Sequence, residues 1–445
     1  MKKWNSLPEN VFLKGFFLCF SLSFLAAAFC MPDRGQMLTG LWKILGAPTK
    51  ASTNFFSLGG YAATFLNMAL VGLVCTAVYC IPGKKANHAA VLVTILTTGF
   101  GSWGIHILNM WPTMFGVVLF CLVRKVPVGD HSNAMLFSTG VAPFISELLV
   151  RYPNAEVVGF SPMGVVLAIA VGVFVGFFLP AGLENSPRVH KGFDLYSAAL
   201  PVGMTAFLLQ GVLYRAMGVP VPEAVSDLSV ASSVIVNTFC ILLFSACVIV
   251  AFAMGCRPKD YWRLLIDPDQ IVDFAAAYDN AAMLMNVGMY GLFILGYYNL
   301  IGAELNGVTF GVIFCMLATC NSGSHPGNIW PIMLGYAAAS WLFRLLSPLT
   351  GGAFTQYLSS QSIIVGLCYA NGLSPIADKY GWFYGTVAAM AHFCMVTTVP
   401  VLHGGMCLYN GGFTAALVCL LMVPSLERHF RPKLERRAAR QAGKN

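Results

Sequence analysis

Charged side chains are scarce in this chain: they make up 10% of its 445 residues, whereas 57% of the residues are hydrophobic. Soluble domains carry about 25% charged residues, so this composition excludes a soluble globular protein. Apolar runs of about 20 residues recur from end to end, and a helix of that length crosses about 30 Å of hydrocarbon. The alternating ten-residue strands of a membrane barrel are missing. We therefore predict an all-α polytopic membrane protein.

Several catalytic and nucleotide-binding motifs are also missing. The chain has no zincin H-E-x-x-H, no P-loop and no nucleophile elbow, and the G-x-G-x-x-G letters of Gly99–Gly104 follow no strand. None of its 14 cysteines forms a C-x-x-C pair, which argues against a disulfide framework. We expect no cofactor, no bound metal and no enzymatic activity. Without an ATPase domain, any active transport would draw on an ion gradient.

Basic residues outnumber acidic ones, 26 to 18, largely because of the C-terminal segment RHFRPKLERRAARQAGKN. Such a segment is typical of a cytoplasmic tail beside anionic lipid, and we expect no nucleic-acid partner. The first apolar run, 11–30, follows lysines but lacks a clear small-residue cleavage site. It therefore predicts a retained helix and not a signal peptide.

One string of residues occurs twice. H-x-x-N-x-W-P-x-M-x-G begins at His106 and again at His325, 219 positions later, although the chain has only eight histidines and eight tryptophans. Four further blocks recur in the same order: WKILGAP and WRLLIDP, NMALVG and NVGMYG, TGVAP and NGLSP, and HKGFDLYS and HGGMCLYN. We therefore predict an N-terminal membrane repeat (1–224), a C-terminal membrane repeat (225–427) and a basic cytoplasmic tail (428–445).

Each repeat is expected to contain about five spans and one broken or re-entrant helical hairpin. A long helix leads into a short interfacial segment and a second span. A 36-residue apolar segment broken by the duplicated string follows, then a run broken at G-x-x-P and two more spans. The expected ranges are 10–31, 38–55, 57–81, 89–124, 133–151, 157–183 and 193–215 in the first repeat, and 231–255, 258–273, 279–301, 308–343, 362–379, 382–402 and 404–426 in the second.

The positions of Lys and Arg predict how the repeats cross the membrane, because basic residues collect in cytoplasmic loops. Lys85 and Arg124 flank the broken segment of the first repeat, so this segment is expected to enter and leave on one side. An odd number of crossings per repeat then inserts the two copies upside down relative to each other, as in many secondary transporters. Lys43, Lys50 and Arg344 do not fit this scheme. A duplicated scaffold without transport is the alternative.

The duplicated strings carry the first candidate binding residues. A helix can break at membrane depth only where protein or water satisfies the freed backbone groups, and the N-terminus of the next half-helix carries a partial positive charge. Pro112 and Pro331 suit the first turn of such a half-helix. An anion or polar solute could bind there, or the polar side chains could cap the broken ends with nothing bound. The candidates are His106, Asn109, Ser102, His325, Asn328 and Ser324.

Two acids follow the G-x-x-P breaks, Glu147 in GVAPFISE and Asp378 in GLSPIAD. Ionisable residues at membrane depth are costly and are usually functional or paired. We expect them to bind H⁺ or Na⁺ as a coupling ion. The alternative is an interfacial position, because Arg151 and Lys379 are close in sequence.

Five further polar residues recur in the matched blocks. Asn67 and Asn286 lie in the second span of each repeat, where they line a solute pathway or make hydrogen bonds between helices. Tyr196, Tyr409 and Asn410 open the last span of each repeat. They contact a solute or anchor the helix at the membrane interface.

The segments LWKILGAP, GGYAATFLNMALVG, SHPGNIWPIMLG and LHGGMCLYNGGFTAALV resemble a domain-of-unknown-function family of bacterial integral membrane proteins about 450 residues long. The resemblance covers nearly the whole chain and implies this architecture and a bacterial inner membrane, without an activity. LYNGGFTAAL is also similar to the Tyr-Asn stretch of urea channels, which are inverted five-helix repeats, although the Asn-Pro signature is missing here.

Together these patterns predict a secondary transporter for a small polar or anionic solute, coupled to H⁺ or Na⁺ and embedded in the bilayer. A passive pore of the urea-channel type is the first alternative. A membrane enzyme that uses His106 and His325 as acid–base groups on a lipid-borne substrate is the second. The sequence leaves the solute and any homo-oligomeric state open.

Overall fold

The computed structural model describes residues 2–83, 85–153, 158–223, 229–267 and 273–436. Lys84, residues 268–272 of the second interfacial segment and residues 437–445 of the basic tail lie outside this part of the chain. Within the described residues every regular element is helical, and eight helices are long and apolar enough to cross a membrane. The prediction of an all-α polytopic membrane protein is confirmed.

The helices follow the expected order closely. The first half contains α2 (Glu9–Cys30), α3 (Met37–Leu45), α5 (Tyr61–Val78), α6 (His88–Phe100), α7 (Trp111–Arg124), α8 (Ser132–Phe137), α9 (Ala142–Val150), α10 (Pro162–His190) and α11 (Ala199–Gln210). The second contains α12 (Ser233–Met254), α13 (Pro258–Ile266), α15 (Asn280–Leu300), α16 (Gly307–Leu317), α17 (Pro326–Leu346), α18 (Gln361–Ala370), α19 (Ser374–Tyr380), α20 (Trp382–Val396) and α22 (Asn410–His429). Short helices α1 (Lys2–Asn5), α4 (Phe55–Gly59), α14 (Phe274–Ala277) and α21 (Val399–Leu402) complete the set.

Small residues set the close packing of the long helices. A Cβ atom added to Gly72 on α5 would lie 2.5 Å from the Ser21 hydroxyl oxygen on α2. A Cβ atom added to Gly288 on α15 would lie 2.5 Å from Cγ2 of Val248 on α12. Helices in lipid associate through such close van der Waals contact, because lipid tails are as apolar as the side chains themselves.

The first broken segment has two short helices, and its ends lie close together; that the broken segments enter and leave on one side of a membrane stays a prediction. Helices α6 and α7 have 13 and 14 residues, so each is about 20 Å long and shorter than the hydrocarbon core. A Cβ atom on Gly83, before α6, would lie 2.5 Å from the backbone of Gly129, after α7. In the second half Asn306 Nδ2, at the start of α16, donates to Gln361 Oε1, at the start of α18 (2.7 Å).

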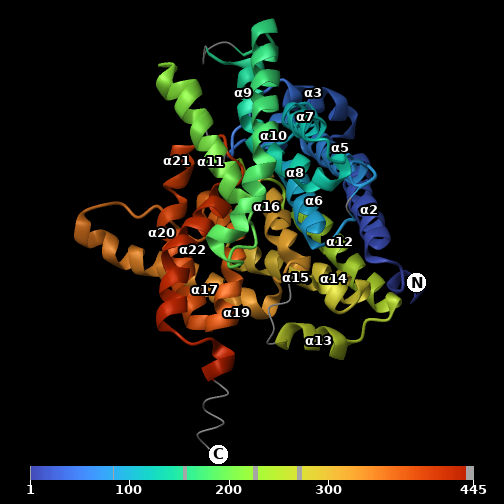
Figure 1. The fold of residues 1–445 in the computed structure, drawn as a ribbon, viewed down its shortest axis with the longest axis vertical. Coiled ribbons are helices and arrows are strands. Elements are labelled where there is room, and N and C mark those ends of the chain that lie inside the picture. Colours follow the sequence, from blue (N-terminus) through green and yellow to red (C-terminus); the bar gives the residue numbers. More distant parts are fainter. Residues whose placement is uncertain (1, 84, 154–157, 224–228, 268–272, 437–445) are drawn as a thin grey trace, which may run out of the picture.

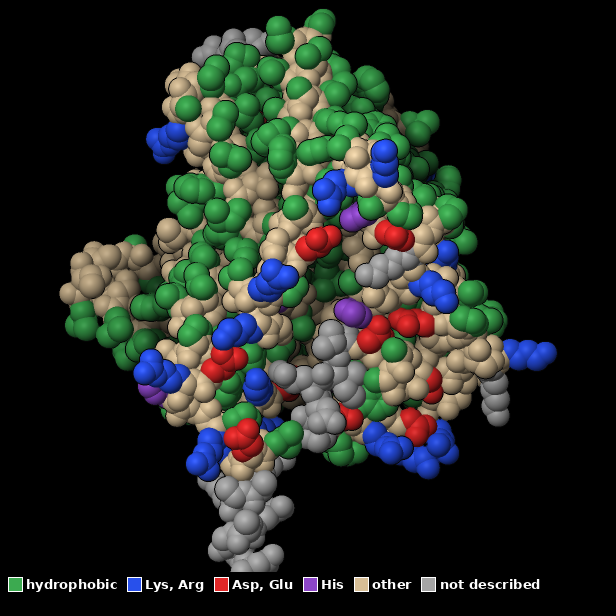
Figure 2. Space-filling model, viewed as in Figure 1, with side chains coloured by type: hydrophobic (Ala, Val, Ile, Leu, Met, Phe, Trp, Pro, Cys, Tyr) green, Lys and Arg blue, Asp and Glu red, His purple; other side chains and the backbone are tan. Residues whose placement is uncertain are grey.

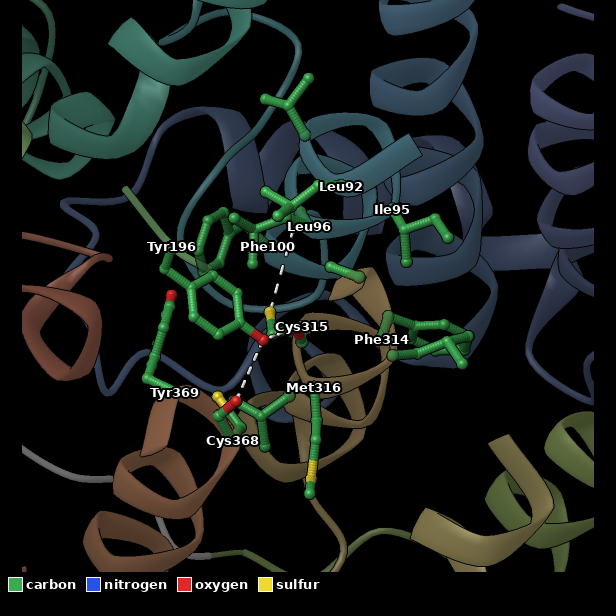
Figure 3. Packing of buried hydrophobic residues seen from close by; sticks show 14 of the residues in the cluster. Leu92, Ile95, Leu96, Phe100, Tyr196, Phe314, Cys315, Met316, Cys368 and Tyr369 are labelled. Atoms are coloured by element: carbon green, nitrogen blue, oxygen red, sulfur yellow. Dashed lines mark hydrogen bonds between the residues drawn. The ribbon is translucent and has the colours of Figure 1, made fainter. Parts of the chain in front are cut away.

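The two halves interlock through these hairpins. Helix α6 packs on α16, and the Cys315 thiol contacts the Leu96 carbonyl oxygen at 3.9 Å (Figure 3). Loops from each half cap the hairpin of the other: Asn54 Oδ1 accepts the Gly307 N–H (2.8 Å), and Asp273 Oδ2 accepts the His88 N–H (3.3 Å). The matched residues of the two halves therefore meet at the centre of one molecule.

Corresponding elements of the two halves lie at opposite ends of the molecule. In Figure 1, α3 and α9 lie near the top, whereas their counterparts α13 and α19 lie near the bottom. Figure 2 shows that the upper part of the same face is mostly hydrophobic, and that Lys, Arg, Asp and Glu gather on the lower part. The division into two repeats that are inverted relative to a membrane stays a prediction.

Three details differ from the expectations. Pro331 lies inside α17 and Pro326 occupies the first turn, because the helix begins directly after His325; Pro112 lies in the first turn of α7 as expected. Helix α10 continues to His190. Helix α11 begins only at Ala199, so the segment 191–198 is a non-helical loop where a span was expected.

Candidate functional site

The first hairpin tip is held by Asn67. Its side-chain amide donates to the carbonyl oxygens of Gly101 (2.7 Å) and Ile105 (2.8 Å), and its Oδ1 accepts the Ile107 N–H (3.3 Å). All three backbone groups belong to the break between α6 and α7. One buried side chain therefore replaces hydrogen bonds that the helix has lost.

Asn286 holds the second tip in the same way. Its amide donates to the carbonyl oxygens of Cys320 (2.7 Å) and Ser324 (2.9 Å), and its Oδ1 accepts from the Tyr261 hydroxyl (3.1 Å). Both carbonyl acceptors lie 219 positions after those of Asn67. The duplicated sequence blocks thus form the same local structure twice.

The spacing of His and Asn within the duplicated string has a structural cause in the first half. The His106 N–H donates to Asn109 Oδ1 (2.9 Å), and Asn109 Nδ2 donates to the Gly104 carbonyl (3.1 Å). Asn109 Nδ2 also reaches Ser146 Oγ (2.9 Å), and His106 Nε2 lies 3.1 Å from the same oxygen. Both His106 and Asn109 are fully buried.

His325 and Asn328 repeat this arrangement as a capping box for α17. The His325 N–H donates to Asn328 Oδ1 (3.0 Å), and the Gly327 N–H donates to His325 Nδ1 (3.1 Å). Asn328 Nδ2 donates to the Gly323 carbonyl (2.8 Å) and to Asp378 Oδ2 (2.9 Å). These bonds fit the capping interpretation, and binding of a solute at the two strings stays a prediction.

The two candidate acids, Glu147 and Asp378, do not make equivalent contacts. Asp378 and Ser146 each stand three residues after the proline of G-x-x-P, and each bonds the Asn of the hairpin string. Glu147 lies one position further on and forms an ion pair with Arg151, whose Nε lies 2.9 Å from Glu147 Oε2. The sequence comparison missed Ser146 because it sought a matching acid; counting from the proline would have found it.

The two candidate serines do not occupy equivalent places. Ser102 Oγ donates to the Gly307 carbonyl (2.7 Å), so it joins the two halves of the chain. Ser324 is buried, and its carbonyl is the group that accepts from Asn286.

Tyr196 lies at the centre of the molecule. Its hydroxyl donates to the carbonyl oxygens of Cys315 (2.7 Å) and Cys368 (3.1 Å), both in the second half (Figure 3). Tyr409 is also buried, and Asn410 Oδ1 hydrogen-bonds His403 Nδ1. These residues pack inside the protein, and their contact with a solute stays a prediction.

A cavity of about 570 Å³ with both apolar and polar lining residues lies between α6, α8, α10 and the 191–198 loop. Figure 2 shows a hollow in the charged lower part of this face, where these elements meet. None of the binding residues predicted from the sequence is among the described residues that line it. The polar side chains that do are Tyr79, Lys85, His88, Asp130, His131, Ser132, Asn133, Glu184, His190, Asp194, Ser197 and Ser322.

Asp273 borders this region and connects it to the second half. His88 Nδ1 lies 3.1 Å from Asp273 Oδ2, and the Ala276 N–H donates to Asp273 Oδ1. Burial acts to raise the pKa of the Asp273 carboxyl, but these hydrogen bonds outweigh burial and leave its pKa below the ordinary value. The carboxylate is therefore a stable cap for α6.

The corresponding loop of the second half, which follows His403, is closed by a segment of the first half. The Ala51 N–H donates to the Gly405 carbonyl (2.8 Å). The ammonium of Lys50 donates to the carbonyl oxygens of Gly404 (3.2 Å) and Pro222, and Lys50 is only 5% exposed. Its burial explains why Lys50 departed from the expected distribution of basic residues.

A second cavity, of about 420 Å³, lies at the tip of the second hairpin. Asn328 and Asp378 line it together with Trp330 and Trp382. Lys433 and Arg436 of the C-terminal segment lie at its rim, and the Arg436 guanidinium donates to the Tyr380 carbonyl. The C-terminal segment therefore covers this site.

The fold and these sites define a multi-pass helical membrane protein with two broken hairpins that meet at its centre. The chain belongs to the family described as protein of unknown function (DUF1576), whose model matches residues 33–215 and 257–428. No curated protein and no solved structure matches the chain, so the likeness to urea channels gains no support.

Proposed function

We propose that the protein is a secondary transporter for a small polar solute, and that the structure corresponds to a state open on one side. One observation carries the proposal: the 570 Å³ cavity reaches solvent beside the loop after His190, whereas Lys50 and Ala51 close the loop after His403. Alternating access needs such a difference between two matched halves.

The arrangement of the halves supports this proposal. Matched helices lie at opposite ends of the molecule (Figure 1), and each half caps the hairpin of the other. If the halves are inverted repeats, exchange of their two conformations closes the present cavity and opens an equivalent one at the other end. A passive pore would need no such closed face.

Charge gives the orientation that we propose. Lys85, Arg124 and Lys191 belong to the loops on the side of the cavity, and basic loops face the cytoplasm. The cavity then opens to the cytoplasm of a bacterial inner membrane, with the C-terminus on the same side. Among the described residues three acids line the cavity beside one lysine, so an uncharged or cationic solute fits it better than an anion.

Thiol labelling from the two sides of the membrane tests this proposal. In a variant without the exposed cysteines 19, 30, 80 and 394, Ser197→Cys places a thiol in the cavity and Thr49→Cys places one in the buried segment that closes the loop after His403. We expect an impermeant maleimide to label the thiol introduced at position 197 from the cytoplasm. The thiol introduced at position 49 should react from the outside, and more slowly.

Two results would contradict the proposal. Labelling of both positions from the same side excludes inverted access. If position 197 reacts but position 49 stays unlabelled at every temperature at which the protein is folded, the protein is a static scaffold. Flux into proteoliposomes of a solute found by thermal-shift screening then measures transport directly, and its dependence on an imposed H⁺ or Na⁺ gradient identifies the coupling ion.

A further inference from the structure

Asp194 is a buried acid with one unpartnered carboxylate oxygen in the described structure. It lies in the loop between α10 and α11 and is 2% exposed. Its Oδ1 accepts the Tyr196 N–H (2.9 Å), but its Oδ2 is buried and has no hydrogen-bond partner among the described residues. This carboxylate is also part of the lining of the 570 Å³ cavity.

Asp194 forms no ion pair in the described part of the chain. The ion pairs found there involve other acids. His190 is close, but its Nδ1 accepts the backbone N–H of Asp194 (3.3 Å). Its Nε2–H is then the donor to Ser197 Oγ (2.8 Å), so the imidazole is neutral. A buried carboxylate without a partner is costly, and a bound positive charge removes that cost.

A second unsatisfied oxygen belongs to a residue that lines the same cavity from the other half of the chain. Ser322 follows the tip of the second hairpin and is 3% exposed, and its Oγ is buried without a partner in the described structure. It lines the cavity together with Asp194. Two residues from separate halves of the chain therefore line one cavity, and each has a buried oxygen that is not bonded to a described residue.

We propose that Asp194 and Ser322 form a binding site for a monovalent cation, either an inorganic ion or the ammonium group of the solute. The inference rests on the proposed transport function, because it names the charge that the cavity receives. One carboxylate balances one positive charge, whereas a divalent ion would leave an excess charge in a poorly solvated place. Carboxylate and hydroxyl oxygens are hard ligands that suit Na⁺, K⁺ and ammonium alike.

The site is single although the chain is duplicated. In the matched blocks HKGFDLYS and HGGMCLYN, Cys407 occupies the place of Asp194. At the 219-residue offset, Trp103 occupies the place of Ser322. The second site that the duplication would predict therefore lacks both oxygens, and we expect one cation per chain.

Calorimetric titration of the purified protein tests the site. NaCl, KCl and methylammonium chloride are each titrated in a buffer whose only other cation is bis-tris propane. We expect saturable binding of at least one of the three with one ion per chain. The Na⁺ and K⁺ arms report an inorganic ion, and the methylammonium arm reports the charged end of a solute.

Two variants and one control locate the binding. Asp194→Asn should raise the Kd by about tenfold or more, and Ser322→Ala by about threefold, in line with the loss of a charged and a neutral oxygen ligand. Glu184→Gln, an exposed acid on the same cavity, should leave the Kd unchanged. In cation-free buffer Asp194→Asn should unfold at the same or a higher temperature than the unaltered protein, because it removes an unpaired buried charge.

Other outcomes overturn the site or separate it from the transport function. No saturable binding of any of the three cations, or equal binding by Asp194→Asn, refutes the site. If a cation binds at Asp194 but no solute or ion crosses proteoliposome membranes, the site stands and the transporter proposal fails. Gradient-driven flux without cation binding refutes only the site.

Discussion

Replacing Asn67 by alanine measures how much of the broken hairpin depends on one side chain. Asn67 is fully buried and satisfies the carbonyls of Gly101 and Ile105 and the N–H of Ile107. Each buried backbone group left unpaired costs about 1–3 kcal/mol. Because water and local shifts recover part of the loss, we expect Asn67→Ala to reduce the free energy of unfolding by about 3–5 kcal/mol.

Thermal unfolding in detergent, followed by tryptophan fluorescence, is the assay. We expect the Tm of Asn67→Ala to fall by roughly 5 °C or more. Asn286→Ala should show a similar loss, because its amide bonds the matching carbonyls in the second half. The matched control is Asn237→Ala, a partly exposed residue of α12 that bonds Asn299 near the surface; its Tm should change little.

The comparison among these three variants can refute the reasoning. If Asn67→Ala and Asn237→Ala change the Tm equally, the buried amide does not hold the break between α6 and α7. If Asn67→Ala is destabilising but Asn286→Ala is not, the two tips are not energetically equivalent, despite their matched hydrogen bonds.

Three further predictions concern the acids and the helix packing. Asp378→Asn keeps an oxygen for the Asn328 amide, so its Tm should equal that of the unaltered protein. If this acid carries the coupling ion, uptake by the variant should lose its dependence on H⁺ or Na⁺. An unchanged ion response in flux assays counts against that role. Glu147→Gln should lower the unfolding free energy by about 3–5 kcal/mol, because it breaks a buried ion pair; chemical denaturation measures this, and stability like that of the unaltered protein would show the pair to be dispensable. Gly288→Ala should lower the Tm, since the added Cβ atom would lie 2.5 Å from Val248; an unchanged Tm would show that α12 and α15 move apart freely.

Much of the fold could be predicted from local signals. Long apolar runs define the spanning helices, since the bilayer sets their length. The hairpin breaks were also visible, because Gly, Pro, His and Asn cluster at Gly101–Gly104 and Gly323–Asn328 within otherwise apolar sequence. The repetition at an offset of 219 pointed to two matched tips, and the hydrogen bonds of Asn67 and Asn286 show that both are built alike.

The candidate site was predicted less well, because it depends on distant contacts. The sequence drew attention to His106 and His325. These histidines and the asparagines three residues later use most of their hydrogen bonds to cap broken helices. Ser146 was missed because a serine and an aspartate play the same part in the two halves. Asp194 lay inside a recognised repeat block, yet nothing in the block shows that one of its oxygens lacks a partner.

The order of the amino acids is enough to identify a helical membrane protein, to place its helices and to locate the two breaks, because these properties follow from the composition of contiguous segments. Which polar groups are satisfied, and which face a cavity, depends instead on how those segments pack in three dimensions. Asp194 and Ser322 lie on one space because the 191–198 loop of the first half folds beside the hairpin tip of the second. Tyr196 of that loop donates its hydroxyl to the Cys315 carbonyl of α16, and no local pattern encodes a contact between segments so far apart in the chain.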